Sequence, residues 1–196
     1  MNNTPVFLLH GLGSHPWTLW PLQWYLMNVK HYVRVYCLSY PVDQLDWEDT
    51  LDYVDREMSR WANKTSESVI LIGQSMGGVV SNHMHEKGWN VKQAIYIGSP
   101  LKGARILHRL NRWLPRAVRD LMFKKPYGIL MTKDQETKPP HPFHTISLGW
   151  FWSDFDGCVF RDEATLDDTH HTHLACADHR TIFANPRLWK YVGQWL

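Results

Sequence analysis

The sequence predicts an α/β fold, in which helices cover both faces of a mostly parallel sheet. Short apolar runs alternate with amphipathic stretches of helical length, and this alternation is typical of such a sheet. A Gly-x-Ser-x-Gly motif stands between one apolar run and the helical stretch after it. The 196 residues, 44% hydrophobic and 20% charged, suit a single compact domain that spans the whole chain.

Strands are expected where β-branched or aromatic residues form short apolar runs. These runs are Val6–Leu9, Val33–Leu38, Val69–Ile72, Ala94–Ile97 and Phe143–Leu148. A sixth strand is expected over His171–Cys176, where polar and apolar residues alternate. Helices are expected over the longer stretches Pro16–Asn28, Trp47–Asn63, Ser75–Lys87 and Pro186–Trp195. The last helix has a clear start, because Asn185 can cap it and Pro186 suits its first position.

The segment from Leu101 to Pro142 interrupts this alternation, and we expect it to form a short helical lid. It holds ten lysines and arginines against three acidic residues. Apolar residues at helical spacing, among them Ile106 and Leu110, predict helices that Pro115 divides. Such a basic amphipathic helix can contact lipid headgroups, but a solvated outer face is the simpler interpretation. Its aromatic residues do not form a base-stacking platform, so nucleic acid is not expected as a partner.

Ser75 is the candidate nucleophile. It lies in Gly73-Gln74-Ser75-Met76-Gly77, directly after an apolar strand and at the start of a helix, which is the context that this motif needs. Attack requires an exposed hydroxyl on a sharp turn, and Gly73 and Gly77 avoid collisions with the neighbouring strand and helix. The helix start also directs backbone N–H groups toward a developing oxyanion.

A second glycine turn, His10-Gly11-Leu12-Gly13, follows the first strand. It can direct the Leu12 N–H toward the same site, where it would pair with the Met76 N–H as an oxyanion hole. We expect His10 to support this loop by hydrogen bonding and not to transfer protons.

The remaining catalytic groups are expected downstream, because with this strand–serine–helix turn the order is nucleophile, acid, base. Asp156 follows the fifth strand and is the preferred acid, since the next residue, Gly157, permits a tight turn. Asp154 is the alternative. His179 is the candidate base, on the loop between the last strand and the final helix.

Together these residues resemble bacterial lipases and small esterases of the α/β-hydrolase superfamily. The resemblance implies the α/β-hydrolase fold, attack by Ser75 on a carbonyl, proton transfer through His179, and orientation of that imidazole by Asp156. Many relatives have histidine where this chain has Gln74. The residues that carry the resemblance are His10–Leu12, Gln74–Gly78, Gly98–Gly103, Asp156–Gly157, and His179 with Asn185–Pro186.

The histidine-rich run from Asp167 to His173 has some features of a metal site. Histidines at alternate strand positions can share a metal, but neither a CxxC nor an HExxH pattern accompanies them. A polar strand edge is therefore the better interpretation, and no metal or other cofactor is expected. The three cysteines, Cys37, Cys158 and Cys176, form no disulfide framework.

The leading hypothesis is a serine hydrolase that cleaves small or lipid-derived carboxylic esters through an acyl-enzyme. A thioesterase or acyltransferase would use the same triad, and a non-catalytic binding protein could retain the same fold.

The sequence shows no signal peptide and no apolar run of about 18 residues, which predicts a cytoplasmic protein without stable membrane insertion. Peripheral lipid contact and the oligomeric state are left open. The eleven tryptophans are expected in a pocket wall or the core.

Overall fold

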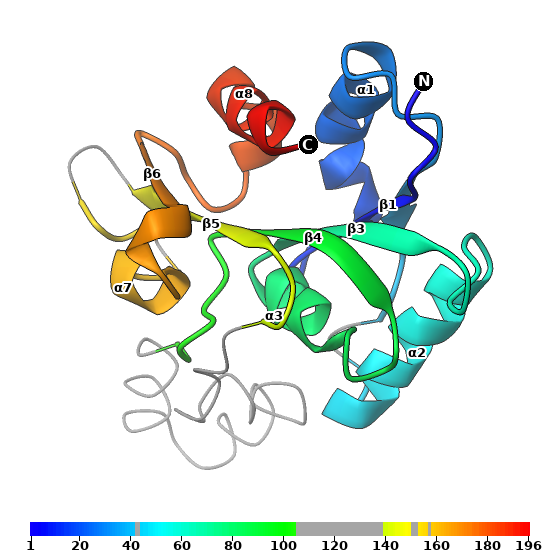
Figure 1. The fold of residues 1–196 in the computed structure, drawn as a ribbon. Coiled ribbons are helices and arrows are strands. Elements are labelled where there is room, and N and C mark those ends of the chain that lie inside the picture. The colour runs from blue at the N-terminus through cyan, green and yellow to red at the C-terminus, as the bar shows by residue number, and fades with distance from the viewer. Residues whose placement is uncertain (42–43, 105–138, 150–152, 157) are drawn as a thin grey trace.

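Six parallel strands form one sheet at the centre of the molecule (Figure 1). The computed structural model describes residues 1–41, 44–104, 139–149, 153–156 and 158–196. The sheet confirms the predicted α/β fold, and its strand order is β2-β1-β3-β4-β5-β6. The strands are β1 (Val6–Leu9), β2 (Val35–Leu38), β3 (Ser68–Gln74), β4 (Asn90–Ile97), β5 (Phe143–Gly149) and β6 (His171–Ala175).

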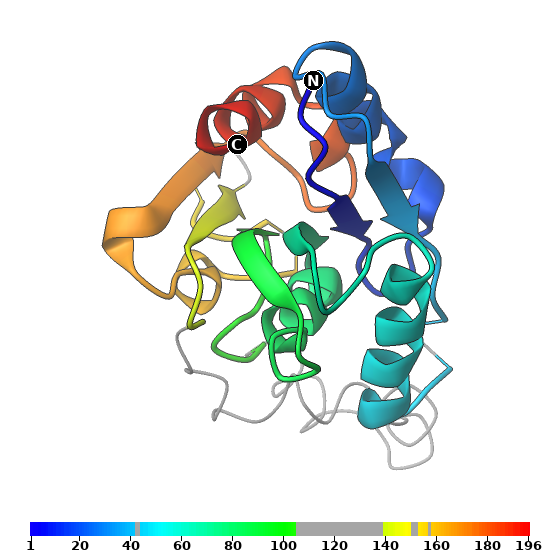
Figure 2. The same ribbon diagram turned by 45° about the vertical axis from the view of Figure 1, so that its right-hand side comes forward.

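Helices cover both faces of the sheet (Figure 2). One face packs against α2 (Trp47–Ser59) and α3 (Met76–His83), and the other against α1 (Trp20–Asn28) and α8 (Pro186–Trp195). Side chains alternate along each strand, so Phe7 and Leu9 enter the first core while Val6 and Leu8 enter the second. This double burial explains why the central strands β1 and β3 are nearly continuous apolar runs in the sequence.

The order of the strands places a topological switch point at the carboxyl ends of β1 and β3. The chain runs from β1 outward to β2 and then returns to the other side of β1 to form β3. The connections that leave β1 and β3 therefore diverge to opposite faces. Ligands of open α/β sheets bind at such a switch point, and both the His10–Gly13 turn and Ser75 follow these two strands.

Two predicted helices differ in their starts. The stretch Pro16–Asn28 is divided into a 3₁₀ turn, η1 (Pro16–Leu19), and α1, because Pro21 has no N–H for the bond that would continue the helix back to Trp17. The helix expected from Ser75 starts one residue later, at Met76, because Ser75 has left-handed backbone angles. By contrast, α8 starts as expected, with the Asn185 side chain accepting from the Arg187 N–H at 2.9 Å.

Short elements near β6 complete the fold. They are α7 (Arg161–Ala164), η3 (Asp168–His170) and η4 (Ile182–Ala184), none of which was expected from the sequence. Residues 105–138, which hold most of the predicted lid, lie outside the described residues. The assignment of the whole chain to a single domain remains a prediction. Among the helices described, none has the length and apolar character to cross a membrane.

The packing of α3 against β1 generates a stability prediction. A side chain at Gly77 would collide with the backbone carbonyls of Leu9 and His10, and backbone atoms cannot rotate away. We expect Gly77→Ala to lower the free energy of unfolding by at least about 2 kcal/mol, in the upper part of the range for overpacked cores. Urea unfolding followed by circular dichroism measures the loss.

Gly193→Ala is the matched control for this substitution. Gly193 is also helical, and its new methyl group would meet the end of the Tyr25 side chain, which can move. We expect a loss of less than about 1 kcal/mol. Equal losses in the two variants would contradict the close approach of α3 to β1.

Candidate functional site

Ser75 occupies a sharp turn between β3 and α3. Its backbone angles, φ 53° and ψ −124°, lie where residues other than glycine are rarely found. Its N–H donates to the Ile97 carbonyl at 2.9 Å, and its carbonyl accepts from the Gly78 N–H at 3.0 Å. The neighbouring strand β4 and the first turn of α3 therefore hold this strained conformation from both sides.

The glycines on either side of Ser75 are required by close backbone approach. A side chain at Gly73 would collide with the backbone of Gly77 and Gly78, and one at Gly77 with that of β1. A methyl group at Gly11 would come within 2.9 Å of the Ser75 Cβ, so the glycine turn after β1 lies directly beside the serine. The glycines therefore allow the close approach of these turns, and the catalytic support expected from Gly11, Gly73 and Gly77 remains a prediction.

Asp156 and His179 form a buried pair at the same end of the sheet. The His179 Nδ1–H donates to Asp156 Oδ2 at 2.6 Å, and the two residues are 9% and 4% exposed. The other carboxylate oxygen accepts from the Cys158 and Val159 N–H groups at 2.8 and 2.7 Å. The carboxylate is thus fully hydrogen-bonded, and it can hold the imidazole in one orientation and one tautomer.

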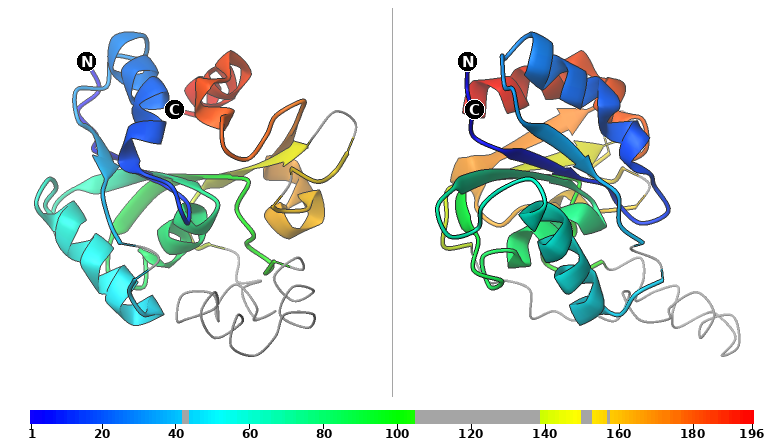
Figure 3. Two further views of the ribbon diagram at one scale, coloured as in Figure 1. Left: turned by 180° about the vertical axis from the view of Figure 1, so that it is seen from behind. Right: turned by 90° about the vertical axis from the view of Figure 1, so that its right-hand side faces the viewer.

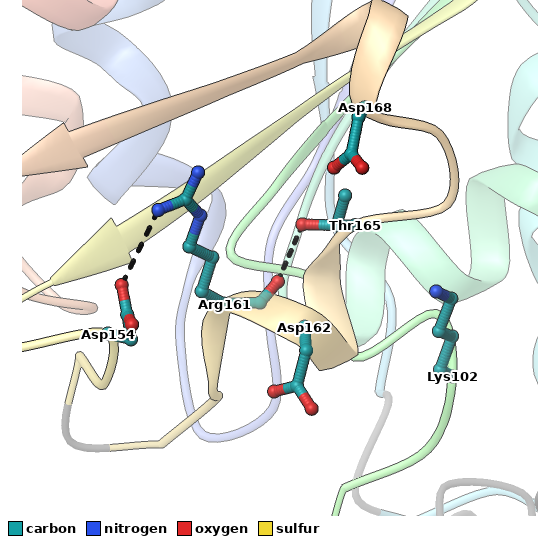
Figure 4. A pocket seen from close by; sticks show the side chains of 6 residues that line it. All are labelled: Lys102, Asp154, Arg161, Asp162, Thr165 and Asp168. Atoms are coloured by element: carbon teal, nitrogen blue, oxygen red, sulfur yellow. Dashed lines mark hydrogen bonds and ion pairs between the residues drawn. The ribbon is translucent and has the colours of Figure 1, made fainter.

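The alternative acid, Asp154, lies elsewhere. Its exposed carboxylate faces Arg161 at 3.7 Å and borders a cavity of about 430 Å³ beside α7 (Figure 4). This geometry favours Asp156 as the partner of His179. The cavity is lined by charges of both signs, from Lys102, Asp154, Arg161, Asp162 and Asp168, and by Thr165.

The described residues include no hydrogen bond from the Ser75 hydroxyl to His179. Their closeness is instead visible through the neighbours of both residues. Gly98, which follows the Ile97 that bonds to Ser75, has φ +52°, and a methyl group there would lie 3.2 Å from Asp156 Oδ2 and 3.3 Å from His179 Nδ1. The serine–histidine bond of such sites is often long before substrate binds.

The turn after β1 fits the predicted oxyanion loop. His10 is buried, its Nδ1–H donates to the Gly11 carbonyl at 2.9 Å, and its ring stacks on Tyr40 at 4.5 Å between centroids. Within the part of the chain that the structure describes, the Leu12 and Met76 N–H groups have no protein acceptor. The pairing of these two N–H groups as an oxyanion hole remains a prediction.

Gln74 is a site residue whose role the sequence did not reveal. Its Oε1 accepts from the Gly11 N–H at 3.3 Å, and its Nε2 donates to the His179 carbonyl at 2.5 Å. The side chain is only 5% exposed. Gln74 therefore connects the turn before the nucleophile to the oxyanion loop and to the loop of the candidate base. A polar residue inside a buried strand end was the only signal in the sequence.

The histidines of the Asp167–His173 run face their neighbours in the sheet. His171 bonds to the hydroxyls of Thr145 and Ser147, at 2.8 and 2.9 Å, and His173 Nδ1 lies 2.8 Å from the Ser147 hydroxyl. Burial, assisted by the charge of Arg161, lowers the pKa of His171 to about 4 and also lowers that of His173. These histidines form a polar network between β5 and β6, as the strand-edge interpretation predicts.

One group of potential metal ligands occurs among the described residues. Ligand atoms of Asp156, Cys158 and His179 lie within 4.8 Å of one another. Two of these three side chains already share the 2.6 Å hydrogen bond. The third side chain, Cys158, is exposed.

The sequence matches the alpha/beta hydrolase family over residues 6–195. Since this span covers nearly the whole chain and all of the site residues above, the chain belongs to the alpha/beta hydrolase family. The resemblance drawn from the motifs is thereby confirmed at the level of the family. A comparison of the sequence with curated proteins gives no match.

Solved structures of lipases and esterases share this fold. The mature lipase BlEst2 of Bacillus licheniformis is 16% identical, with a TM-score of 0.69 over 98% of this chain and 91% of the lipase. A monoacylglycerol lipase of Paleococcus ferrophilus is 16% identical, with a TM-score of 0.63 over 98% and 95%. The Pyrococcus furiosus esterase Pf2001 is 18% identical, with a TM-score of 0.58 over 100% and 83%. At these identities, the likeness shows the fold alone.

The contacts of Gln74 generate a prediction about Ser75. Gln74→Met keeps the volume but loses both hydrogen bonds, so the loops of Leu12 and His179 should move relative to the serine. We expect Ser75 to react with a fluorophosphonate roughly 10 to 100 times more slowly, as small misplacements in active sites do. The half-buried Gln93 of β4 provides the control, and Gln93→Met should react at the wild-type rate. A wild-type rate for Gln74→Met would contradict this positioning role.

Proposed function

We propose that this chain is a serine hydrolase that cleaves carboxylic esters through an acyl-enzyme intermediate. The observation that carries the proposal is the buried 2.6 Å hydrogen bond between Asp156 and His179, next to the strained turn of Ser75. A buried aspartate that orients an imidazole beside such a serine has the geometry of proton transfer in acyl-transfer enzymes. The family, together with the lipases and the esterase that share this fold, supports the same class.

In the proposed mechanism, Ser75 Oγ attacks the ester carbonyl while His179 Nε2 accepts its proton. Asp156 holds the proton on Nδ1 and stabilises the imidazolium that forms. The Leu12 and Met76 N–H groups stabilise the oxyanion of the tetrahedral intermediate. His179 then returns the proton to the leaving alcohol, and in the second half-reaction it activates the water that releases the acyl group.

The nucleophile is tested by covalent labelling. Incubation with a fluorophosphonate probe should label the wild-type protein at Ser75 and leave Ser75→Ala unlabelled. Ser14 lies close to the site and bonds to Thr18, so Ser14→Ala is the matched control and should be labelled fully. Persistent labelling of Ser75→Ala, or a wild-type protein that does not react, would refute the serine hydrolase.

The acid and the base are tested by paired substitutions. Asp156→Asn and His179→Ala should each lower kcat for a p-nitrophenyl ester by at least roughly a thousandfold, because triad members act as a unit. Asp154→Asn and His173→Ala change nearby groups of the same chemistry and should alter kcat by less than about threefold. If His173→Ala, and not His179→Ala, gave the large loss of kcat, the assignment of His179 as the base would be wrong.

A series of substrates identifies which leaving group and which acyl acceptor the enzyme uses. The proposal of a carboxylic esterase expects higher kcat/KM for p-nitrophenyl esters and monoacylglycerols than for acyl-CoA thioesters of the same chain length. A preference for thioesters, or transfer of the acyl group to an alcohol in place of water, would identify a thioesterase or acyltransferase with the same triad.

A further inference from the structure

A row of exposed tryptophans runs along η1 and α1. Trp17, Trp20 and Trp24 are 58%, 61% and 56% exposed, and Met27 continues the row at 43%. Spacings of three and four residues place Trp20, Trp24 and Met27 on one side of the helix, while Leu22 and Leu26 are buried against the sheet. The expectation that the tryptophans lie in a pocket wall or the core is wrong for these three residues.

The chemistry of these side chains suits the boundary between lipid and water. Within the described residues, the indole N–H groups of Trp17, Trp20 and Trp24 have no hydrogen-bond acceptor. An exposed indole with a free N–H can bury its ring at the level of lipid headgroups while the N–H bonds to their oxygens. Exposed apolar residues normally occur singly on protein surfaces. Three exposed tryptophans within eight residues are therefore unusual.

The charge of this side of the molecule points to an anionic partner. The helices α1 and α8 lie next to each other on one face of the sheet (Figure 3), where Tyr25 stacks on Trp189. Neither helix contains an acidic residue, nor do η1 and η4, whereas α8 exposes Arg187 and Lys190.

The other face of the sheet has the opposite character. The helix α2 contains five acidic residues and one arginine. The loop between β6 and η4 contains one acidic residue, Asp178. Its carboxylate accepts hydrogen bonds from the N–H groups of Arg180 and Thr181 in the same loop. The basic residues of α8 are therefore not paired with acidic residues of their own helix or of α1.

We propose that the docking face, defined by Trp17, Trp20 and Trp24 with Arg187 and Lys190, binds anionic lipid surfaces. The tryptophans insert among the headgroups, and the two cations attract the negative surface potential. A symmetric dimer through this face is disfavoured, because it would bring the basic residues of two copies together. The face begins at η1, two residues after the glycine turn that follows β1.

Sedimentation with vesicles tests this docking. The wild-type protein should bind vesicles of phosphatidylcholine with phosphatidylglycerol more strongly than phosphatidylcholine alone, and added salt should weaken the binding. Trp20→Ser/Trp24→Ser should lower the partition coefficient at least roughly tenfold. Arg187→Glu/Lys190→Glu should do the same, but only for the anionic vesicles.

Matched controls come from outside the docking face. Trp61, two residues beyond α2, is 50% exposed, and Lys92 is exposed on β4. Trp61→Ser and Lys92→Glu should therefore bind vesicles as the wild type does. Circular dichroism and hydrolysis of a soluble ester should be unchanged in Trp20→Ser/Trp24→Ser. Ser75→Ala should bind vesicles normally, so docking is tested separately from the proposed hydrolase activity.

Three outcomes would overturn the proposal. They are a wild-type protein that does not bind either kind of vesicle, equal loss of binding in the control variants, and full binding after both double substitutions. A wild-type dimer that Trp20→Ser/Trp24→Ser converts to a monomer, without vesicle binding, would assign the tryptophans to contact between two copies. Light scattering across a range of protein concentrations distinguishes that result.

Discussion

The left-handed backbone of Ser75 persists because strand β4 and helix α3 bond to it from both sides. Its N–H is satisfied by Ile97, its carbonyl by Gly78, and the absence of side chains at Gly73 and Gly77 allows the strand, the helix and β1 to approach within backbone contact. A strained backbone conformation of this kind persists only where contacts with the surrounding structure hold it in place. The rest of the candidate site is arranged around this turn.

The residue before the turn extends that constraint to two distant loops. Gln74 is buried, so both polar ends of its amide must be hydrogen-bonded, and their partners are the Gly11 N–H and the His179 carbonyl. A single side chain thus relates the predicted oxyanion loop to the loop of the predicted base. Gly98 contributes in a second way. Because it has no side chain, Asp156 and His179 can lie against the end of β4.

Burial of the sheet on both faces leaves the outer surfaces of the helices for contacts with other molecules. These surfaces differ in kind, since α2 is acidic, α1 exposes tryptophans and has no charged residue, and α8 exposes two basic residues. Apolar residues alone do not distinguish them, because each helix also needs an apolar side toward the sheet. The accessible surface of individual tryptophans depends on how each helix is rotated against the sheet.

The sequence by itself determined the α/β architecture, all six strands, the cap of α8 and the turn at Ser75. Each of these depends on local patterns such as apolar runs, capping residues and glycine spacing. Only the tertiary structure decided which aspartate pairs with His179, how Gln74 is bonded and which tryptophans reach solvent. Gln74 and His179 are 105 positions apart, and a contact of that kind has no local signal, because it exists only after the strands have paired and their loops meet at one edge.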